Sequence, residues 1–263
     1  MFPKFRLDGQ LSRGALALLL AVTAGTAVLD ATPAFAKDKK EEAAQPKMAY
    51  SKPFIAAAQP FQKALEAAKT RADVVAAQQN VAAATAAYNS AQGSAARKAA
   101  MEQRIAALAA LGATLANEKA MLDAAFAAGT TPDDKYGAGT LALQLGGVAQ
   151  DTTLQRRALQ AMIDSGKTSP ADAPKFNFFL GQFAFDAHEY PAAVAALQAA
   201  VNAGYAGNDV AVLLAEAYVA NGQLGVGLDK LKAAIDARSA AGNLAPEQWY
   251  RRGLGQIGRA SCR

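Results

Sequence analysis

The sequence predicts an all-α fold, in which an antiparallel Ala-rich helical hairpin over residues 53–128 precedes shorter helix pairs over 129–256. Residues 53–128 consist mainly of alanine, leucine and long polar residues, which are good helix formers. From about residue 145 onward, small and large apolar residues recur at one fixed spacing. No segment shows the apolar and polar alternation between turns that strands require.

The N-terminal segment 1–36 has the pattern of a signal peptide. Lys4, Arg6 and Arg13 precede an apolar run, and small residues before Lys37 suit cleavage. The run is shorter than the ~20 apolar residues of a spanning helix, so a permanent anchor is the weaker alternative. We expect an exported protein that is periplasmic in a Gram-negative-type cell, or else extracellular or associated with the outer envelope. We expect no stable membrane span after cleavage.

The segments at either end of the mature chain are expected to lie outside the fold. Residues 37–52 carry charges of both signs and predict a flexible leader. Residues 257–263 resemble the translation of a sequencing-library adapter, so we expect a non-native tail after a natural protein that continues further. This tail holds the only cysteine, Cys262, which excludes disulfides from 37–256. Without 1–36 and the tail, the net charge falls from +5 to +2, which gives no argument for nucleic-acid binding.

The predicted hairpin has two apolar stripes, separated by Gly93 and Ser94. Alanine-rich stripes let two helices approach closely, which favours an antiparallel intramolecular pair. A dimeric coiled-coil stalk is the alternative, but the sequence lacks sustained heptads. The stripe residues are Leu65, Ala68, Ala72, Val75, Val81, Ala84 and Tyr88 in the first segment, and Ile105, Leu108, Leu111, Leu115, Met121, Leu122 and Phe126 in the second.

A domain boundary is predicted near residue 129. Thr130 or Thr131 can cap a new helix, and Pro132 suits its first turn. The adjacent acids Asp133 and Asp134 are then favourable charges at a helix N-terminus.

Residues of matching size recur 34 positions apart in the second half of the chain. The matched pairs are Leu180 with Leu214, Gly181 with Ala215, Tyr190 with Leu224, Ala193 with Gly227, Leu197 with Leu231, and Ala200 with Ala234. The turns His188–Pro191 and Asn221–Gly222 would separate the two helices of each unit.

This pattern resembles the tetratricopeptide repeat, a helix–turn–helix unit of 34 residues. The resemblance implies units at about 174–207 and 208–241, a degenerate unit at about 139–168, and a truncated unit from about 245. It also implies that small residues stand where the two helices cross, as Gly181 or Ala215 on the first helix and Ala193 or Gly227 on the second. A generic Ala/Leu-rich bundle is the alternative.

The sequence offers no catalytic, metal or cofactor site that we would predict. His188 is the only histidine and lies in a predicted turn, so it cannot supply the several ligands of a zinc site. The glycines near residues 146 and 226 lack the preceding strand of a phosphate-binding loop. We therefore expect a protein that is not an enzyme.

Stacked helix pairs form a groove lined by their first helices, and such grooves bind peptides or partner helices. The resemblance implies groove positions at Lys175, Phe178, Gln182, Phe185, Asp186, Asp209, Val212, Glu216, Val219 and Ala220. A protein or peptide partner with apolar and basic residues would fit them. For Phe178 and Phe185, packing in the core is an equal alternative. The other functional hypotheses are an envelope protein that acts through the hairpin 53–128, and the non-catalytic part of a larger enzyme.

Overall fold

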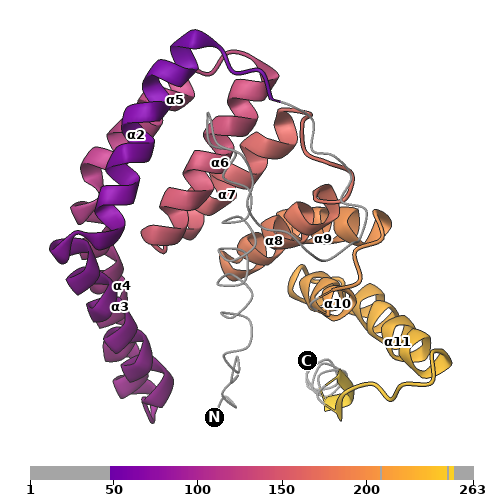
Figure 1. The fold of residues 1–263 in the computed structure, drawn as a ribbon. Helices are drawn as coiled ribbons and strands as arrows, with labels where there is room; N and C mark the ends of the chain where they lie inside the picture. Colours follow the sequence, from indigo (N-terminus) through magenta and orange to yellow (C-terminus); the bar gives the residue numbers. More distant parts are fainter. Residues whose placement is uncertain (1–47, 208, 248, 252–263) are drawn as a thin grey trace. The chain divides into compact units, whose positions relative to one another are not determined.

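The computed structural model describes residues 48–207, 209–247 and 249–251, and in this part of the chain all regular structure is helical (Figure 1). The predicted signal peptide, the first eleven leader residues and the tail 257–263 lie outside the described residues. The chain divides into two compact units at the Lys167–Thr168 bond. We call them the first and the second unit.

The first unit is built from two long broken helices and one shorter helix pair, α6 and α7. The first broken helix, α2 and α3, runs antiparallel to the second, α4 and α5, so that α2 packs on α5 and α3 packs on α4 (Figure 1). This confirms the predicted helices over 53–128. The bounds are α2 Lys52–Thr70, α3 Ala72–Ser90, α4 Ser94–Thr114, α5 Ala116–Ala128, α6 Pro132–Val148 and α7 Thr152–Asp164.

The two long helices break next to each other, at Arg71 and at Leu115. The sequence pattern did not indicate either break. Arg71 takes an extended backbone conformation between α2 and α3, while Leu115 separates α4 from α5, which meet at 65°. The Arg71 guanidinium donates to the Thr114 carbonyl oxygen and, at 2.8 Å, to the Glu118 carboxylate. Glu118 is 1% exposed, so Arg71 supplies the positive charge that this buried group needs.

We expect Arg71→Leu to lower the melting temperature of the first unit, because it leaves the Glu118 carboxylate buried without its cation. The double variant Arg71→Leu with Glu118→Leu should recover most of that loss, since apolar replacements for a buried ion pair are often neutral. Thermal unfolding followed by circular dichroism measures both. A double variant that melts as low as Arg71→Leu would contradict this role of the ion pair.

The boundary between the units falls after α7 and not near residue 129, because α6 packs on α2 and α5. A Cβ at Gly137 on α6 would lie 2.7 Å from the Tyr50 ring and 2.9 Å from the Phe54 ring, so only glycine fits this contact. Between α6 and α7, a Cβ at Gly139 would lie 2.6 Å from Met162. The pair predicted as a degenerate repeat thus belongs with the hairpin.

The last residues of the predicted leader, 48–52, are held in place and are not flexible. The backbone N–H groups of Ala49 and Ser51 donate to the carboxylates of Asp133 and Asp134 at 2.7 and 2.8 Å. Asp134 also forms a capping box with Thr131, as the predicted helix start requires. The two acids therefore do more than favour a helix N-terminus: they fix the entry of the chain into α2.

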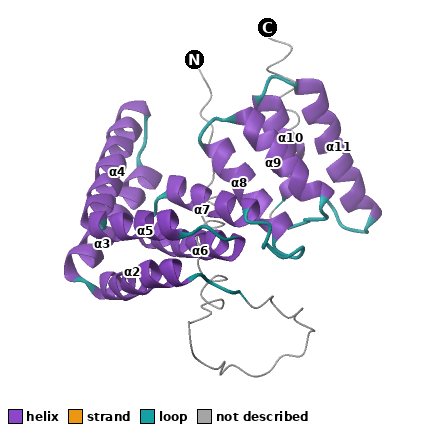
Figure 2. Cartoon of the chain, turned by 90° about the horizontal axis from the view of Figure 1, so that it is seen from above, coloured by secondary structure: helices purple, strands orange, loops and turns teal. Residues whose placement is uncertain are grey.

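The second unit consists of two successive helix pairs, α8 with α9 and α10 with α11, and α10 also packs on α9 (Figure 2). These pairs match the predicted units at about 174–207 and 208–241, with α8 beginning one residue earlier. The bounds are α8 Ala173–Asp186, α9 Tyr190–Asn202, α10 Val210–Ala220 and α11 Leu224–Ala240.

Glycine permits the close crossing in each pair, as expected. A Cβ at Gly181 on α8 would lie 2.5 Å from Leu197 Cγ on α9. A Cβ at Gly227 on α11 would lie 2.7 Å from the Ala215 carbonyl oxygen on α10. Both distances are shorter than any normal Cβ contact, so the helices could not come this close with a larger residue.

The two pairs also turn in the same way. At the end of α8, His188 has φ 63° and Glu189 N–H donates to the Ala184 carbonyl oxygen. At the end of α10, Gly222 has φ 81° and Gln223 N–H donates to the Tyr218 carbonyl oxygen. Both are helix ends closed by one left-handed residue, and these residues are 34 positions apart.

We expect His188→Gly to raise the melting temperature of the second unit, since a left-handed conformation costs a residue with a Cβ roughly 1–2 kcal/mol. The matched variant Gly222→His should lower it by a similar amount. No atom lies within 4 Å of a Cβ built at Gly222, so the new side chain meets no neighbour there. A lower melting temperature of Gly222→His would therefore report backbone strain alone. Unchanged melting in both variants would contradict the left-handed turns.

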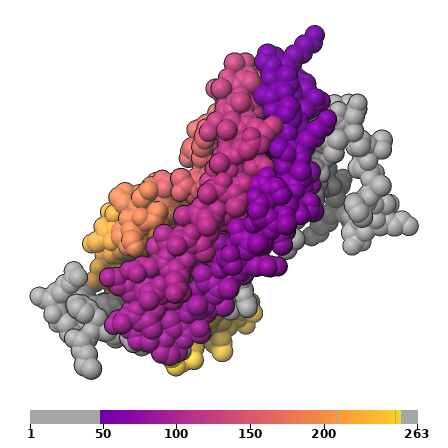
Figure 3. Space-filling model, turned by 90° about the vertical axis from the view of Figure 1, so that its left-hand side faces the viewer, coloured from indigo at the N-terminus to yellow at the C-terminus, as the bar shows by residue number. Residues whose placement is uncertain are grey.

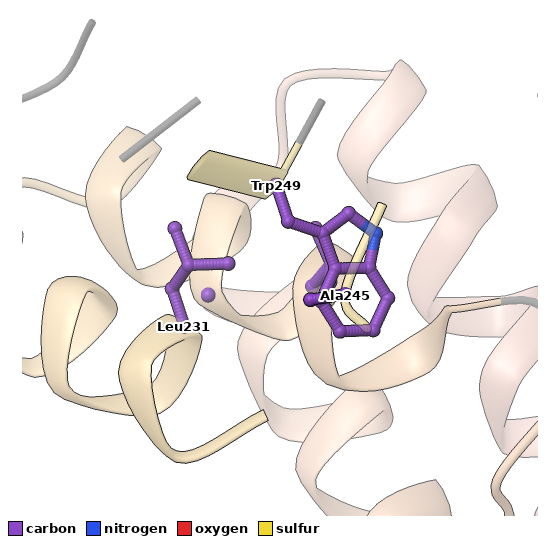
Figure 4. Packing of buried hydrophobic residues seen from close by; sticks show 5 residues of the cluster. Leu231, Ala245 and Trp249 are labelled. Atoms are coloured by element: carbon purple, nitrogen blue, oxygen red, sulfur yellow. The ribbon is translucent and has the colours of Figure 1, made fainter. Parts of the chain in front are cut away.

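Trp249 packs on the last described helix pair of the second unit. It is 5% exposed and packs with Leu231 and Ala245 against the α10–α11 pair (Figure 4). Val212 and Ala215 on α10 complete this cluster. The residues 249–251 are helical, so the chain starts another helix on the face of the preceding pair.

Candidate functional site

Three of the ten predicted groove positions are buried. Phe178 is 2% exposed, and its ring stacks on Tyr205 at 5.0 Å and meets the edge of Phe179 at 5.2 Å. Gln182 is 3% exposed, and Val212 belongs to the cluster around Trp249. They are core residues because α8 and α10 are both covered by neighbouring helices. For Phe178, the alternative of core packing is the correct one.

The remaining positions reach solvent on the two first helices. Asp186, Asp209 and Ala220 are exposed, while the half-buried positions are Lys175, Phe185, Glu216 and Val219. Val219 is only partly available, because its Cγ2 atom fills the space that a Gly227 side chain would need. The structure therefore leaves one aromatic residue, two aliphatic residues, three acids and one lysine accessible among the predicted positions.

A group of aromatic and polar side chains lies where α8 turns into α9. The Phe185 ring meets Tyr190 at 5.7 Å edge to face, and the Tyr190 hydroxyl lies 3.2 Å from His188 Nδ1. Asp186 is exposed as a residue, but protein atoms around its carboxyl group raise its pKa by desolvation, which the nearby His188 partly offsets. We call these four residues the α8 end cluster.

The α8 end cluster combines aromatic surface with a carboxylate. Aromatic faces and a nearby negative charge attract cationic side chains with apolar stems, such as lysine and arginine. The sequence pattern indicated Phe185 and Asp186 here but missed Tyr190 as a partner of Phe185. The signal was available, since the two aromatic residues stand five positions apart on either side of the turn between α8 and α9.

The described part of the chain holds no cluster of candidate metal ligands. No three His, Cys, Asp or Glu side chains come together there as metal ligands. His188 serves as the turn residue, as predicted, with its left-handed backbone.

None of the described helices is by itself both long and apolar enough to cross a membrane. The bent pair α4 and α5 together reaches the required length and composition, despite the 65° angle between the two helices. Comparison of the chain with protein-family models, with curated proteins and with solved structures finds no match.

Proposed function

We propose that this protein is an exported scaffold of the tetratricopeptide type, which binds a protein or peptide segment on the first helices of its second unit. The observation that carries the proposal is the accessible set on α8, on α10 and at the residue before α10, which holds Phe185 and Val219 together with three acids, Asp186, Asp209 and Glu216, against one base, Lys175. Such a set suits a partner segment with apolar and basic residues. Export rests on the order of charged, apolar and small residues in 1–36.

The assignment to the tetratricopeptide type rests on three features of the second unit. The first is the recurrence of apolar residues at a spacing of 34 residues. The second is the glycine at each helix crossing, Gly181 and Gly227, and the third is the pair of left-handed turns at His188 and Gly222. A generic bundle needs none of these features to recur, so their recurrence favours a repeat.

We expect the double variant Asp186→Lys with Glu216→Lys to bind basic-apolar peptides at least tenfold more weakly than the unchanged protein, because it replaces attraction by repulsion. Fluorescence anisotropy with labelled peptides of leucine and lysine, and with a second series of leucine and glutamate, measures this. The matched control is Asp229→Lys with Asp236→Lys, which makes the same charge change on α11, where both residues reach solvent.

The two variant pairs separate specific binding from bulk charge. Equal loss of binding in both pairs would mean that net charge alone attracts the peptide. Tighter binding of the leucine–glutamate series would overturn the proposed partner chemistry.

A further inference from the structure

His188 follows α8 in a backbone conformation that favours glycine. Its φ is 63°, and the matched residue of the next helix pair, 34 positions later, is Gly222 with φ 81°. A left-handed backbone strains a residue that carries a Cβ, whereas glycine adopts it freely. Strained residues of this kind cluster at binding sites and switches, where the function needs the side chain. The position therefore indicates a role for the His188 imidazole that glycine could not fill.

Tyr190 holds the His188 imidazole in place. The Tyr190 hydroxyl lies 3.2 Å from His188 Nδ1, and the two ring centres are 5.8 Å apart. When the imidazole is neutral, the hydroxyl can donate to Nδ1; when it is protonated, the Nδ1–H group can donate to the hydroxyl oxygen. Because the contact suits both states, the positive charge that His188 gains on protonation stays within the α8 end cluster.

Asp186 is an acid of this cluster that has no strong cation beside it. No lysine or arginine in the described part of the chain forms an ion pair with it. Desolvation of the carboxyl group raises the pKa of Asp186, and the nearby charge that lowers it is that of His188. A nearby cation stabilises a partly desolvated carboxylate. Either a protonated His188 or a basic side chain of a partner can supply that cation.

Most acids of the first unit are already paired with a lysine or arginine. Helices α2 to α5, drawn from indigo to magenta in Figure 3, carry such ion pairs at their surface and at the break beside Arg71. The paired acids among the described residues of this unit are Glu66, Asp73, Glu102, Glu118, Asp123, Asp133 and Asp151. Asp186 differs from them, because its nearby cation is a histidine that can lose its charge.

We propose that His188 regulates the binding of the basic partner segment by pH. When the imidazole is neutral, a lysine or arginine side chain of the partner lies beside Asp186 and against the Tyr190 ring. When the imidazole is protonated, it neutralises Asp186 from within the chain and repels the partner's cation. The segment therefore binds at neutral pH and is released in mild acid. This inference rests on the proposed function, since it assigns a regulation to the same binding face.

His188 is well suited to this role, because it is the only histidine of the chain. Histidine is the side chain whose charge ordinarily changes between pH 5 and pH 8. The other titratable residues on α8, on the helices that pack on it within the second unit and on their connections are Lys175, Asp186, Glu189, Tyr190, Tyr205, Asp209, Glu216 and Tyr218. These are one lysine, four acids and three tyrosines, whose ordinary pKa values lie outside this range.

Fluorescence anisotropy with a labelled, N-acetylated peptide of leucine and lysine, at pH 7.5 and at pH 5.5, tests the proposal. Acetylation removes the α-amino group of the peptide, which would itself titrate in this range. The unchanged protein should bind the peptide at least threefold more weakly at pH 5.5. His188→Asn should bind it equally at both pH values, because asparagine tolerates the left-handed backbone but gains no charge. Circular dichroism at both pH values checks that the proteins stay folded.

The matched control moves the histidine to another surface. His188→Asn with Ser239→His keeps the number of histidines, and residue 239 is exposed on α11. Its affinity should be as insensitive to pH as that of His188→Asn. A loss in the control equal to that in the unchanged protein would assign the effect to net charge. An equal loss in His188→Asn would assign it to Asp186 or another acid. Each of these two results would overturn the proposal.

The unchanged protein separates a failure of this proposal from a failure of the proposed function. If it binds the peptide at pH 7.5 and equally well at pH 5.5, His188 has no regulatory role and the binding face stands. If it binds the peptide at neither pH, the proposed binding face is wrong and the regulation is wrong with it.

Discussion

Gly181→Leu should unfold the second unit or destabilise it by at least about 3 kcal/mol, the upper range for overpacked cores. A Cβ at this position would lie 2.5 Å from Leu197 Cγ and 3.0 Å from the Leu197 backbone nitrogen. The side chain of Leu197 could rotate away, but the backbone of α9 could move only by separating the two helices. Circular dichroism at 222 nm should show lower helicity and an earlier melting transition.

Gly225→Leu is the matched control for this substitution. Gly225 lies on α11, and no atom lies within 4 Å of a Cβ built there. The same chemical change should leave stability unchanged or raise it by up to about 1 kcal/mol, because glycine is a poor helix former. If Gly181→Leu were as stable as Gly225→Leu, the close crossing of α8 and α9 would be wrong, and the repeat would lose its main physical support.

The helices and turns of this chain could be predicted because each depends on residues close in sequence. Helix-forming composition over 53–128, the cap at Thr131 and the turn at Gly222 are local signals, and each was found in the expected place. Gly181 could be placed at a crossing because a small residue that recurs between large ones is typical of two helices in close contact. Local chemistry was therefore sufficient for the all-helical architecture.

The parts that were missed depend on residues far apart in sequence. The break at Arg71 is stabilised by Glu118 and Thr114, and the entry at Ala49 by Asp133, none of which a periodic pattern can indicate. The same limit explains the unit boundary, since α6 joins the first unit through contacts with α2, which lies far from it in sequence.

Contacts between residues far apart in sequence also decide which predicted site positions are exposed. A repeat register assigns Phe178 and Phe185 to one face of α8, but it cannot tell how much of that face the next residues cover. Tyr205, from the turn after α9, stacks on Phe178 and buries it. Phe185 lies about two turns further along α8 and is only half-buried, which is why it remains in the proposed binding face.

Asp134→Ala should destabilise the first unit by about 2–4 kcal/mol, the largest effect that we expect from a single polar group. It removes half of the capping box of α6, worth roughly 0.5–2 kcal/mol. It also leaves the half-buried Ser51 N–H without its acceptor, which costs up to the ~1–3 kcal/mol of a fully buried unsatisfied donor. Urea unfolding at neutral pH measures the change, with Asp123→Ala as the control. Asp123 pairs with Arg157 on an exposed surface and should contribute little.

The same carboxylates should make the first unit acid-sensitive. The hydrogen bonds from Lys167 and from Ala49 N–H lower the pKa of Asp133. For Asp134, desolvation raises the pKa, but hydrogen bonds from Ser51 and Thr131 outweigh it, so its pKa is also lowered from the usual 3.8. A lowered folded-state pKa means that the stabilisation is complete above about pH 4 and is lost as the pH falls through the folded-state values. Urea unfolding between pH 7 and pH 2.5 should therefore show a steeper loss of stability below pH 4 in the unchanged protein than in Asp133→Asn with Asp134→Asn. Equal slopes for the two proteins would mean that these carboxylates do not hold residues 49–51 against α6.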